Sequence, residues 1–376
     1  MSGWPGKTVI GLTGNIATGK SVVRKMLEHL GAYGIDADAL AHRTFAPTAP
    51  GYQPVVDAFG EGILAADGRV DRARLGAVVF QDPDALRKLE AIVHPLVRLA
   101  THNLIRRVPH CVVVIEAIKL LESSMRAGCD SLWVTDAPHA IQTQRLQTQR
   151  GMSLALAEQR IAAQGSQEAK LAAADVIIRN DSGLEQAWQQ VYQAWEAAFT
   201  NDPDQQYTME TGLDGFTVRT ALPPEAGQVV AWLQGLIPRA GPGSAEQALA
   251  DMGSKAYWIL QRHQDVIGIA GWNTDQWIAR VDPVYLDMLH ANREILAALI
   301  NVIDRVALDC QCDAAWVDVS PGLESLRTEL QAAGFLVAEP GAHHYHLGQD
   351  AAGFMNLKNG HLLFKRLTQP DLFQAA

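Results

Sequence analysis

The feature that most constrains this 376-residue chain is a glycine-flanked segment close to its start. The segment reads Gly14-Asn15-Ile16-Ala17-Thr18-Gly19-Lys20-Ser21 and fits the pattern G-x-x-x-x-G-K-[ST]. It follows an apolar stretch, Lys7 to Leu12, that predicts a strand, and it leads into Gly19 to Leu30, which predicts a helix. A strand, a glycine turn and a helix in this order predict a phosphate-binding loop in an α/β fold.

Each residue type in this loop has a physical purpose. The glycines allow the backbone to curl so that its N–H groups face phosphate oxygens, and the helix start adds a positive partial charge. We expect Lys20 to reach the β and γ phosphates of ATP, and the Ser21 hydroxyl to bind Mg²⁺. The residues expected to hold the nucleotide are Gly14, Asn15, Ile16, Ala17, Thr18, Gly19, Lys20, Ser21 and Val22. The alternative is a glycine turn before a helix with an exposed lysine.

Two aspartates follow the next predicted strand, Ala32 to Asp36. Loops at the carboxyl ends of parallel strands face the ligand crevice, so Asp36 and Asp38 should lie near the phosphate loop. A carboxylate there can accept the proton of a hydroxyl that attacks ATP, and we assign this role to Asp38, with Asp36 as support or as an outer ligand of Mg²⁺. The alternative for either residue is the N-cap of a helical turn from Ala39 to Arg43.

Strand and helix patterns alternate through the first 200 residues, which predicts a parallel sheet with helices on both faces. Further strands are expected at Cys111 to Glu116, Ser131 to Thr135 and Asp175 to Arg179, and a closing helix at Leu184 to Phe199. The stretch 201–213 begins with NDPDQQYTMET, which is polar and interrupted by proline, and we interpret it as a linker. The predicted domains are therefore 1–200 and 214–376.

The second domain is predicted to be α+β. Its expected elements, in order, are a strand at Phe216 to Arg219, a helix at Pro224 to Leu236, a hairpin at Ala256 to Trp272 around Arg262 to Asp265, a strand at Trp277 to Asp282, a helix at Arg293 to Leu308, a strand at Ala314 to Val319 and a helix at Leu323 to Ala333.

Three arginines lie in a largely neutral helical stretch, Gln142 to Gly165. Arg145, Arg150 and Arg160 are typical of a cover, or lid, whose guanidinium groups neutralise charge on a transferring phosphate. Exposed helical arginines are the simpler interpretation for any one of them. Lys170 and His94 are weaker candidates, and His94, next to Pro95, also fits a helix cap.

The composition excludes several classes of protein. The chain is 48% hydrophobic and 19% charged, which is typical of a folded globular protein. Acids outnumber bases by 41 to 31, so no general affinity for nucleic acid is expected. Four cysteines without a disulfide pattern, no signal peptide and no long apolar run favour a cytoplasmic protein without a membrane span. We interpret Cys310 and Cys312 as apolar residues at a helix end, not as zinc ligands.

Beyond the phosphate loop, the first half resembles the dephospho-CoA kinase family. The matching segments, in the order and spacing of that family, are Gly11-Leu12-Thr13-Gly14 to Ser21, Gly34-Ile35-Asp36-Ala37-Asp38, His94-Pro95-Leu96-Val97 and Ala174-Asp175-Val176-Ile177-Ile178-Arg179-Asn180. Arg145, Arg150, Gln164 and Lys170 also sit where that family's lid carries such residues. The resemblance covers about residues 7 to 200.

This resemblance implies a P-loop kinase core with a lid, which uses ATP and Mg²⁺ to phosphorylate the ribose 3′-hydroxyl of dephospho-CoA and so completes coenzyme A biosynthesis. It implies Asp38 as the base, Lys20 and Arg150 as catalytic cations, and Asn180 near the adenine. One departure concerns the acceptor. Where the family reads Pro-Leu-Leu-Phe-Glu, this chain reads Ile118-Lys119-Leu120-Leu121-Glu122.

The second half resembles the acetyltransferase fold that binds acetyl-CoA, both in its order of elements and in Ala332-Ala333-Gly334-Phe335. The glycine-rich turn expected before the long helix is replaced by His290-Ala291-Asn292-Arg293-Glu294, so the close approach of a pyrophosphate is hindered. A non-catalytic module that binds CoA or acyl-CoA is favoured over an active acyltransferase or a stabilising domain. We expect His343, His344 and His346 to form an exposed loop, not a metal site.

Two other functions remain open from the sequence. One is a different P-loop kinase of small molecules, which would share the ATP site but not the acceptor. The other is a nucleotide- or CoA-sensing binding protein. The intact Lys20, Ser21, Asp38 and Arg150 favour an enzyme, because a sensor has no need of a base.

Overall fold

A computed structural model describes residues 3–79, 81–199, 208–236, 248, 251–252, 255–275, 277–287, 289–290, 292–319, 322–338, 362–369 and 371–374. The chain divides into two compact units. The first contains residues 1–20, 33–177 and 370–376, and the second contains residues 21–32 and 178–369. The predicted domains 1–200 and 214–376 stay a prediction.

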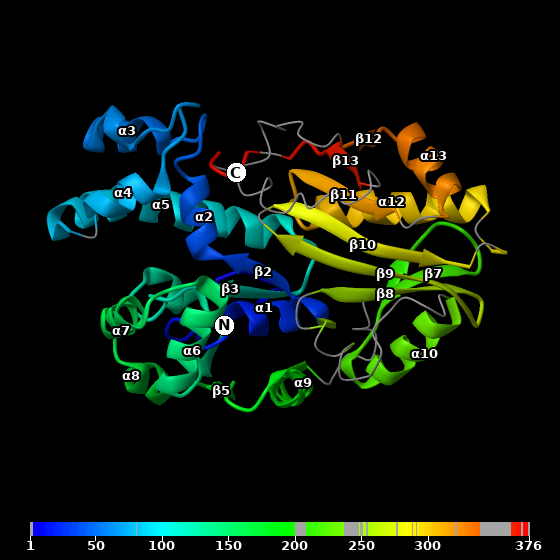
Figure 1. Cartoon of the computed structure of the whole chain (residues 1–376), viewed down its shortest axis with the longest axis horizontal. Coiled ribbons are helices and arrows are strands. Elements are labelled where there is room, and N and C mark those ends of the chain that lie inside the picture. Colours follow the sequence, from blue (N-terminus) through cyan, green and yellow to red (C-terminus); the bar gives the residue numbers. More distant parts are fainter. Residues whose placement is uncertain are drawn as a thin grey trace. The chain divides into compact units, whose positions relative to one another are not determined.

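The first sheet has five strands in the order β2-β3-β1-β4-β5. Figure 1 labels β2, β3 and β5 of this sheet together with the helices of the same half. The bounds of the strands are β1 Thr8–Thr13, β2 Tyr33–Asp36, β3 Val112–Glu116, β4 Ser131–Asp136 and β5 Val176–Arg179. β1 pairs in parallel with β3 and β4, and β2 pairs in parallel with β3. The apolar interiors of β1, β3 and β4 are buried, as expected for strands covered on both faces. The carboxyl ends of these strands therefore meet at one edge.

Helices connect and cover these strands. Their bounds are α1 Lys20–His29, α2 Ala37–Arg43, α3 Tyr52–Phe59, α4 Arg72–Val79, α5 Pro83–Arg107, α6 His139–Arg150, α7 Leu154–Ala162, α8 Gln167–Ala172 and α9 Leu184–Phe199, with short 3₁₀ helices η1 Glu61–Ile63 and η2 Ser124–Gly128. The five expected strands and the helices expected at Gly19 to Leu30 and Leu184 to Phe199 are confirmed to within about one residue at each end, whereas the helical stretch expected over Gln142 to Gly165 is divided between α6 and α7. His94 lies inside α5, so its interpretation as a helix cap was wrong.

The second sheet has eight strands in the order β12-β13-β11-β10-β9-β8-β7-β6. Their bounds are β6 Thr208–Glu210, β7 Phe216–Thr220, β8 Ala256–Arg262, β9 Asp265–Asp275, β10 Ile278–Leu286, β11 Ala314–Val319, β12 Leu336–Val337 and β13 Leu362–Arg366. The accompanying helices are η4 Pro223–Glu225, α10 Ala226–Leu236, α12 Arg293–Asp309 and α13 Glu324–Ala332. In this sheet β10 and β11 run parallel to each other, and the remaining neighbouring strands pair antiparallel.

Two sequence predictions for this half were wrong in detail. The expected linker contains β6, which pairs with β7, so Thr208–Glu210 belongs to the sheet. The strand expected to end at Asp282 continues to Leu286 as β10. The register of β10 shifts between Val281 and Val284, and this irregularity accommodates Pro283, which has no N–H to donate to a neighbouring strand. The loop expected around His343 lies outside the described residues.

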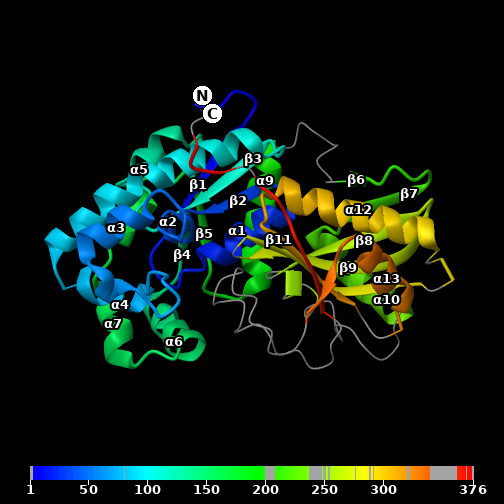
Figure 2. The same ribbon diagram turned by 90° about the horizontal axis from the view of Figure 1, so that it is seen from above.

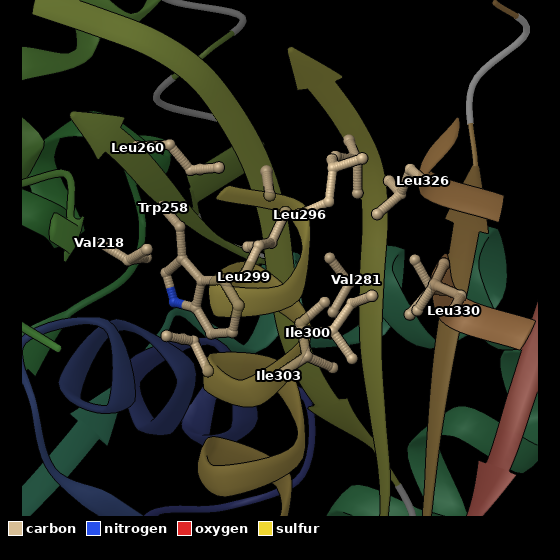
Figure 3. Packing of buried hydrophobic residues seen from close by; sticks show 14 of the residues in the cluster. Val218, Trp258, Leu260, Val281, Leu296, Leu299, Ile300, Ile303, Leu326 and Leu330 are labelled. Carbon is tan, nitrogen blue, oxygen red and sulfur yellow. The ribbon is translucent and has the colours of Figure 1, made fainter. Parts of the chain in front are cut away.

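The core of the second unit forms where α12 packs on the sheet. Figure 3 shows Leu299, Ile300 and Ile303 of α12 beside Trp258 of β8 and Val281 of β10. The apolar residues of α12 recur three and four positions apart, so one face of the helix is continuously apolar. All five of these side chains are at most 3% exposed. The expected α+β architecture is thus built on one large apolar interface.

The final residues of the chain belong to the first unit, where they lie against α5 (Figure 2). The amide of Asn103, which is buried, donates hydrogen bonds to the carbonyls of Leu372 at 2.8 Å and Gln374 at 2.9 Å. Arg107 donates to the carbonyl of Asp371 at 2.9 Å, and the Leu372 side chain is 3% exposed. A tail that follows the second unit in the chain therefore stabilises the first.

Asn103→Ala should lower the free energy of unfolding of the first unit by about 2 kcal/mol, because it removes both hydrogen bonds to the tail and leaves a small cavity. Urea unfolding followed by tryptophan fluorescence measures this change. Arg106→Ala, an exposed position on the same helix, is the control and should change the stability little. Equal stabilities of the Asn103 and Arg106 variants would show that the tail contributes nothing.

Candidate active site

The phosphate-binding segment lies between β1 and α1, as predicted. Gly14 has a φ of 146° and Gly19 a φ of 97°, values that side-chain-bearing residues rarely adopt. A Cβ on Gly14 would also stand 2.5 Å from the carbonyl oxygen of Thr135, so only glycine fits there. These two glycine conformations allow the tight curl that an anion-binding loop requires.

Lys20 carries its charge into a largely buried position, where its side chain is 8% exposed. Burial lowers its pKa to about 8, while the carboxylates of Glu116 and Asp38 oppose this shift. The charges of Lys170 and Arg150 lower the pKa further. A triphosphate at this position would add negative charge to that of Glu116 and Asp38 and would raise the pKa of Lys20.

The two aspartates after β2 have different roles. Asp36 is the N-cap of α2, because its Oδ1 accepts a hydrogen bond from the Ala39 N–H at 2.9 Å. The N-cap alternative therefore holds for Asp36. Asp38 lies in the first turn of the same helix and is not the capping residue. Its carboxylate remains available for chemistry at the carboxyl edge of the sheet.

Desolvation raises the pKa of Asp38 to about 6, and the neighbouring carboxylates of Asp36 and Glu116 add to the shift. The cations of Lys20 and Lys119 act in the opposite direction. Solvent still reaches part of this side chain, so the carboxylate can exchange protons with water. A carboxylate whose pKa lies near neutrality is a better proton acceptor than an ordinary aspartate and is still ionised at pH 7.

Glu116 is a site residue that sequence reasoning missed. It is the last residue of β3 and is only 6% exposed, and its charge affects both Lys20 and Asp38. The signal was present in the sequence, because a single acid ends the otherwise apolar run Cys111 to Glu116. An ionisable residue at the carboxyl end of a buried parallel strand points to the ligand edge.

The arginine-bearing stretch forms two helices, α6 and α7, with Gly151 in the left-handed conformation between them. Arg145 donates a hydrogen bond to the carbonyl of Ala17 in the phosphate loop, at 3.1 Å, and partial burial lowers its pKa. Arg150 ends α6, and its charge reaches Lys20. Arg160 is exposed on α7. The structure thus brings Arg145 and Arg150 to the loop and leaves Arg160 at the surface.

Lys170, a weak candidate from the sequence, is a central part of the site. It is 2% exposed, and its ammonium group donates to Asn15 Oδ1 at 2.7 Å. Desolvation lowers its pKa, and the charge of Glu122 opposes the shift. Glu122 is the acid that remains in the segment that departs from the family pattern.

That departing segment places a new cation beside the site. Lys119 forms an ion pair with Glu90 of α5, with 3.1 Å between Nζ and Oε1. The carbonyl of Ile118 accepts a hydrogen bond from the Thr13 hydroxyl at 3.1 Å, which fixes the start of the segment against β1. Because the charge of Lys119 also affects Asp38, the substitution alters the electrostatics of the expected acceptor side.

Three predicted site residues fall in the second compact unit. Ser21 and Val22 lie in the first turn of α1, directly after Lys20. Asn180 follows β5 and is 4% exposed. The predicted contacts of Ser21 with Mg²⁺, of Val22 with the nucleotide and of Asn180 with adenine stay predictions.

Oxygen ligands suit Mg²⁺, and in the first unit the acids Asp38 and Glu116 supply carboxylate oxygen atoms just after β2 and at the end of β3. Across the described ranges, no group of three or more His, Cys, Asp and Glu side chains is arranged to hold a metal ion by itself. This donor set fits a metal that shares its coordination with nucleotide phosphates, as Mg²⁺ usually does.

Comparison with known proteins identifies the first half of the chain. A family model described as dephospho-CoA kinase matches residues 8–186. A dephospho-CoA kinase from Geobacter sulfurreducens is 41% identical over 194 residues, which is 51% of this chain and 98% of the relative. The chain belongs to the dephospho-CoA kinase family. The predictions of a kinase of this family, and of the last step in coenzyme A biosynthesis, are confirmed.

A second curated relative agrees with this family, and one solved structure is also similar. A dephospho-CoA kinase from Streptomyces avermitilis is 43% identical over 187 residues, 50% of this chain and 91% of the relative. The solved dephospho-CoA kinase from Campylobacter jejuni is 23% identical, with a TM-score of 0.36, over 51% of this chain and 97% of its own.

Other solved structures are similar to about two fifths of this chain. An acetyltransferase of the GNAT family from Streptococcus pneumoniae is 13% identical, with a TM-score of 0.30, over 41% of this chain and 99% of its own. No helix in the part of the chain that the structure describes is long and apolar enough to span a bilayer.

Asp38→Asn should raise the free energy of unfolding at pH 7 by about 1 kcal/mol. This value is smaller than the free energy that corresponds to the full pKa shift, because solvent screens the carboxylate. The folded-state pKa lies above the ordinary value of 3.8, so the native protein binds more protons between about pH 4 and pH 6 and loses stability as the pH rises through this window. Urea unfolding at both ends of the window measures the difference.

The variant and the native protein should have equal stability only at about pH 2, well below both the folded-state pKa and the ordinary value of 3.8, because the carboxylate is then protonated in both the folded and unfolded states. Glu61→Gln, which removes an exposed carboxylate, is the matched control. If Asp38→Asn destabilised the protein at pH 7, the carboxylate would be a stabilising group and the electrostatic description of the site would be wrong.

Proposed function

We propose that this chain transfers the γ-phosphoryl group of ATP to the ribose 3′-hydroxyl of dephospho-CoA, with Asp38 as the base. The observation that carries this proposal is the convergence of a phosphate loop and an aspartate of raised pKa at one edge of a parallel sheet. Membership of the dephospho-CoA kinase family supports the acceptor.

Asp38 accepts the proton of the attacking hydroxyl as the new O–P bond forms and the bond between the γ-phosphorus and the bridging oxygen breaks. ADP leaves with the electrons of that bond. A carboxylate with a pKa of about 6 is mostly ionised at pH 7, and it also orients the hydroxyl for in-line attack. The charge of Glu116 raises the pKa of both Asp38 and Lys20, so the three groups are electrostatically coupled.

Lys20 and Arg150 neutralise charge on the transferring group. Lys20 lies in the loop where β and γ phosphate oxygens are expected, and a bound triphosphate would raise its pKa again. Arg150 supplies a second positive charge from the end of α6. Charge that develops on the phosphoryl oxygens is stabilised by such fixed cations, and this accounts for much of the rate in phosphoryl transfer.

The remaining nucleotide contacts are proposals from the motif. The loop Gly14 to Val22 binds the phosphates of ATP, the Ser21 hydroxyl binds Mg²⁺, and Asn180 contacts the adenine. When bound, Mg²⁺ would neutralise negative charge on the phosphate oxygens. The cytoplasmic location, like the domain boundaries, remains a sequence-based prediction.

The purified protein with ATP and Mg²⁺ should convert dephospho-CoA to CoA, and Asp38→Asn should lower kcat by at least about a hundredfold while the dissociation constant of ATP changes little. A coupled assay of ADP release with chromatography of the CoA product measures turnover, and calorimetry measures ATP binding. The reaction should stop in EDTA. Formation of ADP only with a different acceptor would contradict the substrate assignment.

The pH profile gives an independent test of the base. Because Asp38 must be ionised to accept a proton, kcat/KM should fall on the acid side with an apparent pKa of about 6. Lys119→Leu removes an opposing cation and should move this apparent pKa upward. An acid limb near pH 4 in both proteins would exclude Asp38 as the titrating group.

A second role is proposed for the C-terminal half, where a non-catalytic module would bind CoA or acyl-CoA. At the start of α12 the Oδ1 atom of Asn292 accepts a hydrogen bond from the Ile295 N–H at 3.0 Å, and Arg293 forms an ion pair with Glu329. The helix start is thus capped by its own side chain, which leaves less opportunity for a pyrophosphate. A CoA bound to this half would therefore place its pyrophosphate elsewhere than at the start of α12.

Titration of the full-length protein with CoA should reveal two sites per chain, one in the kinase half and one in the C-terminal half. Calorimetry that resolves both stoichiometry and heat is the measurement, with dissociation constants up to about 1 mM accessible. Saturation at one CoA per chain would contradict the second site. Acetyl-CoA turnover in the presence of amines would contradict the non-catalytic role.

A further inference from the structure

Asn15, the residue after Gly14, forms a hydrogen bond through each of its polar groups. The Asn15 N–H donates to Gln167 Oε1 at 3.0 Å, and its side-chain amide donates to the Gly165 carbonyl at 3.2 Å. Lys170 donates to its Oδ1 at 2.7 Å, and Lys20 donates to its backbone carbonyl at 3.1 Å. Asn15 is 7% exposed, so water contributes little to satisfying these groups.

The next peptide of the loop is held in the same way. The Ile16 N–H donates to Gln164 Oε1 at 2.6 Å. Gln164 lies in the turn between α7 and α8, whereas Gln167 is the first residue of α8. Two consecutive backbone amides of the phosphate loop are therefore bound by two side-chain amides from one short segment, more than 140 residues away in the sequence.

Gln167 also reaches a second part of the site. Its Nε2 donates to the carbonyl of Thr135 at 3.0 Å and to Asp136 Oδ1 at 3.1 Å, both at the carboxyl end of β4. Thr135 is the residue whose carbonyl excludes a Cβ from Gly14. One amide side chain thus fixes the phosphate loop to the strand against which the loop curls.

Glutamine suits this task for an electrostatic reason. Its Oε1 accepts hydrogen bonds from backbone N–H groups without placing a full negative charge near the triphosphate. A carboxylate at position 164 would accept the same hydrogen bond and would repel ATP. A hydrocarbon side chain of similar shape would leave the Ile16 N–H without its partner.

We propose that Gln164 and Gln167 are positioning residues that hold the Asn15 and Ile16 peptides in the orientation required by the triphosphate, and that they link α7 and α8 to the phosphate loop. This inference rests on the proposed use of ATP, but not on the identity of the acceptor. Preorganisation of the loop reduces the entropy cost of binding ATP. Loss of this preorganisation should therefore weaken ATP binding and leave the affinity for the second substrate unchanged.

Gln164→Met and Gln167→Met test the proposal, with Gln159→Met as the matched control, because Gln159 is exposed on the neighbouring α7. Calorimetry should show about tenfold weaker binding of MgATP to both test variants, with the control unchanged. Amide hydrogen exchange at Ile16 should become about tenfold faster in Gln164→Met, and at Asn15 in Gln167→Met. The KM for dephospho-CoA should stay within about twofold of the native value in all three.

Gln164→Glu separates geometry from charge. It keeps an acceptor for the Ile16 N–H, so amide exchange should stay slow, but its charge should weaken MgATP binding, and more so at low ionic strength. A merely structural role predicts a lower melting temperature with unchanged ATP affinity, and that result would overturn the proposal. So would native exchange rates in both Met variants. If the protein bound ATP as expected but did not phosphorylate dephospho-CoA, the proposed acceptor would be refuted. The roles proposed for Gln164 and Gln167 would not be affected.

Discussion

The buried charge of Lys20 is the constraint on which the rest of the first unit depends. An ammonium group in so enclosed a position is costly, and burial lowers its pKa to about 8. The carboxylates of Glu116 and Asp38 offset part of that cost, and they can do so because β3 pairs with β1 and β2 pairs with β3, so their carboxyl ends meet at one edge of the sheet. Desolvation raises the pKa of Asp38, and the charge of Glu116 adds to this rise while that of Lys20 opposes it. The electrostatics of the base and of the phosphate-binding lysine are therefore two aspects of one arrangement.

Much of this arrangement could be predicted from the sequence. The glycine pattern, the strand periods and the aspartates after β2 have local physical causes, and local causes are visible in one chain. Glu116, Gln164 and Gln167 were harder, because their importance comes from contacts across more than 30 residues of sequence. A glutamine in a helical stretch is an ordinary surface residue until the fold brings a backbone N–H to it.

In the second half, the order of helices and strands could be predicted from the sequence, but the ends of some strands could not. The hairpin β8–β9 and the helix α12 have strong periodic signals and lie where expected. β6 was mistaken for linker because it is short and polar, and β10 was cut at Pro283 because proline normally ends a strand. β6 forms because it pairs with β7, and β10 continues past Pro283 because its register is irregular there. Such tertiary effects have no counterpart in a single-sequence pattern.

The tail that lies against α5 affects how the two units can be separated by truncation. Residues 178–369 are placed between two parts of the first unit, so in topology they are an insertion, not an appendage. A stop codon at the end of α9 would remove the partner of the Asn103 amide along with the second unit. Truncation after α9 would therefore destabilise the first unit as well as remove the second.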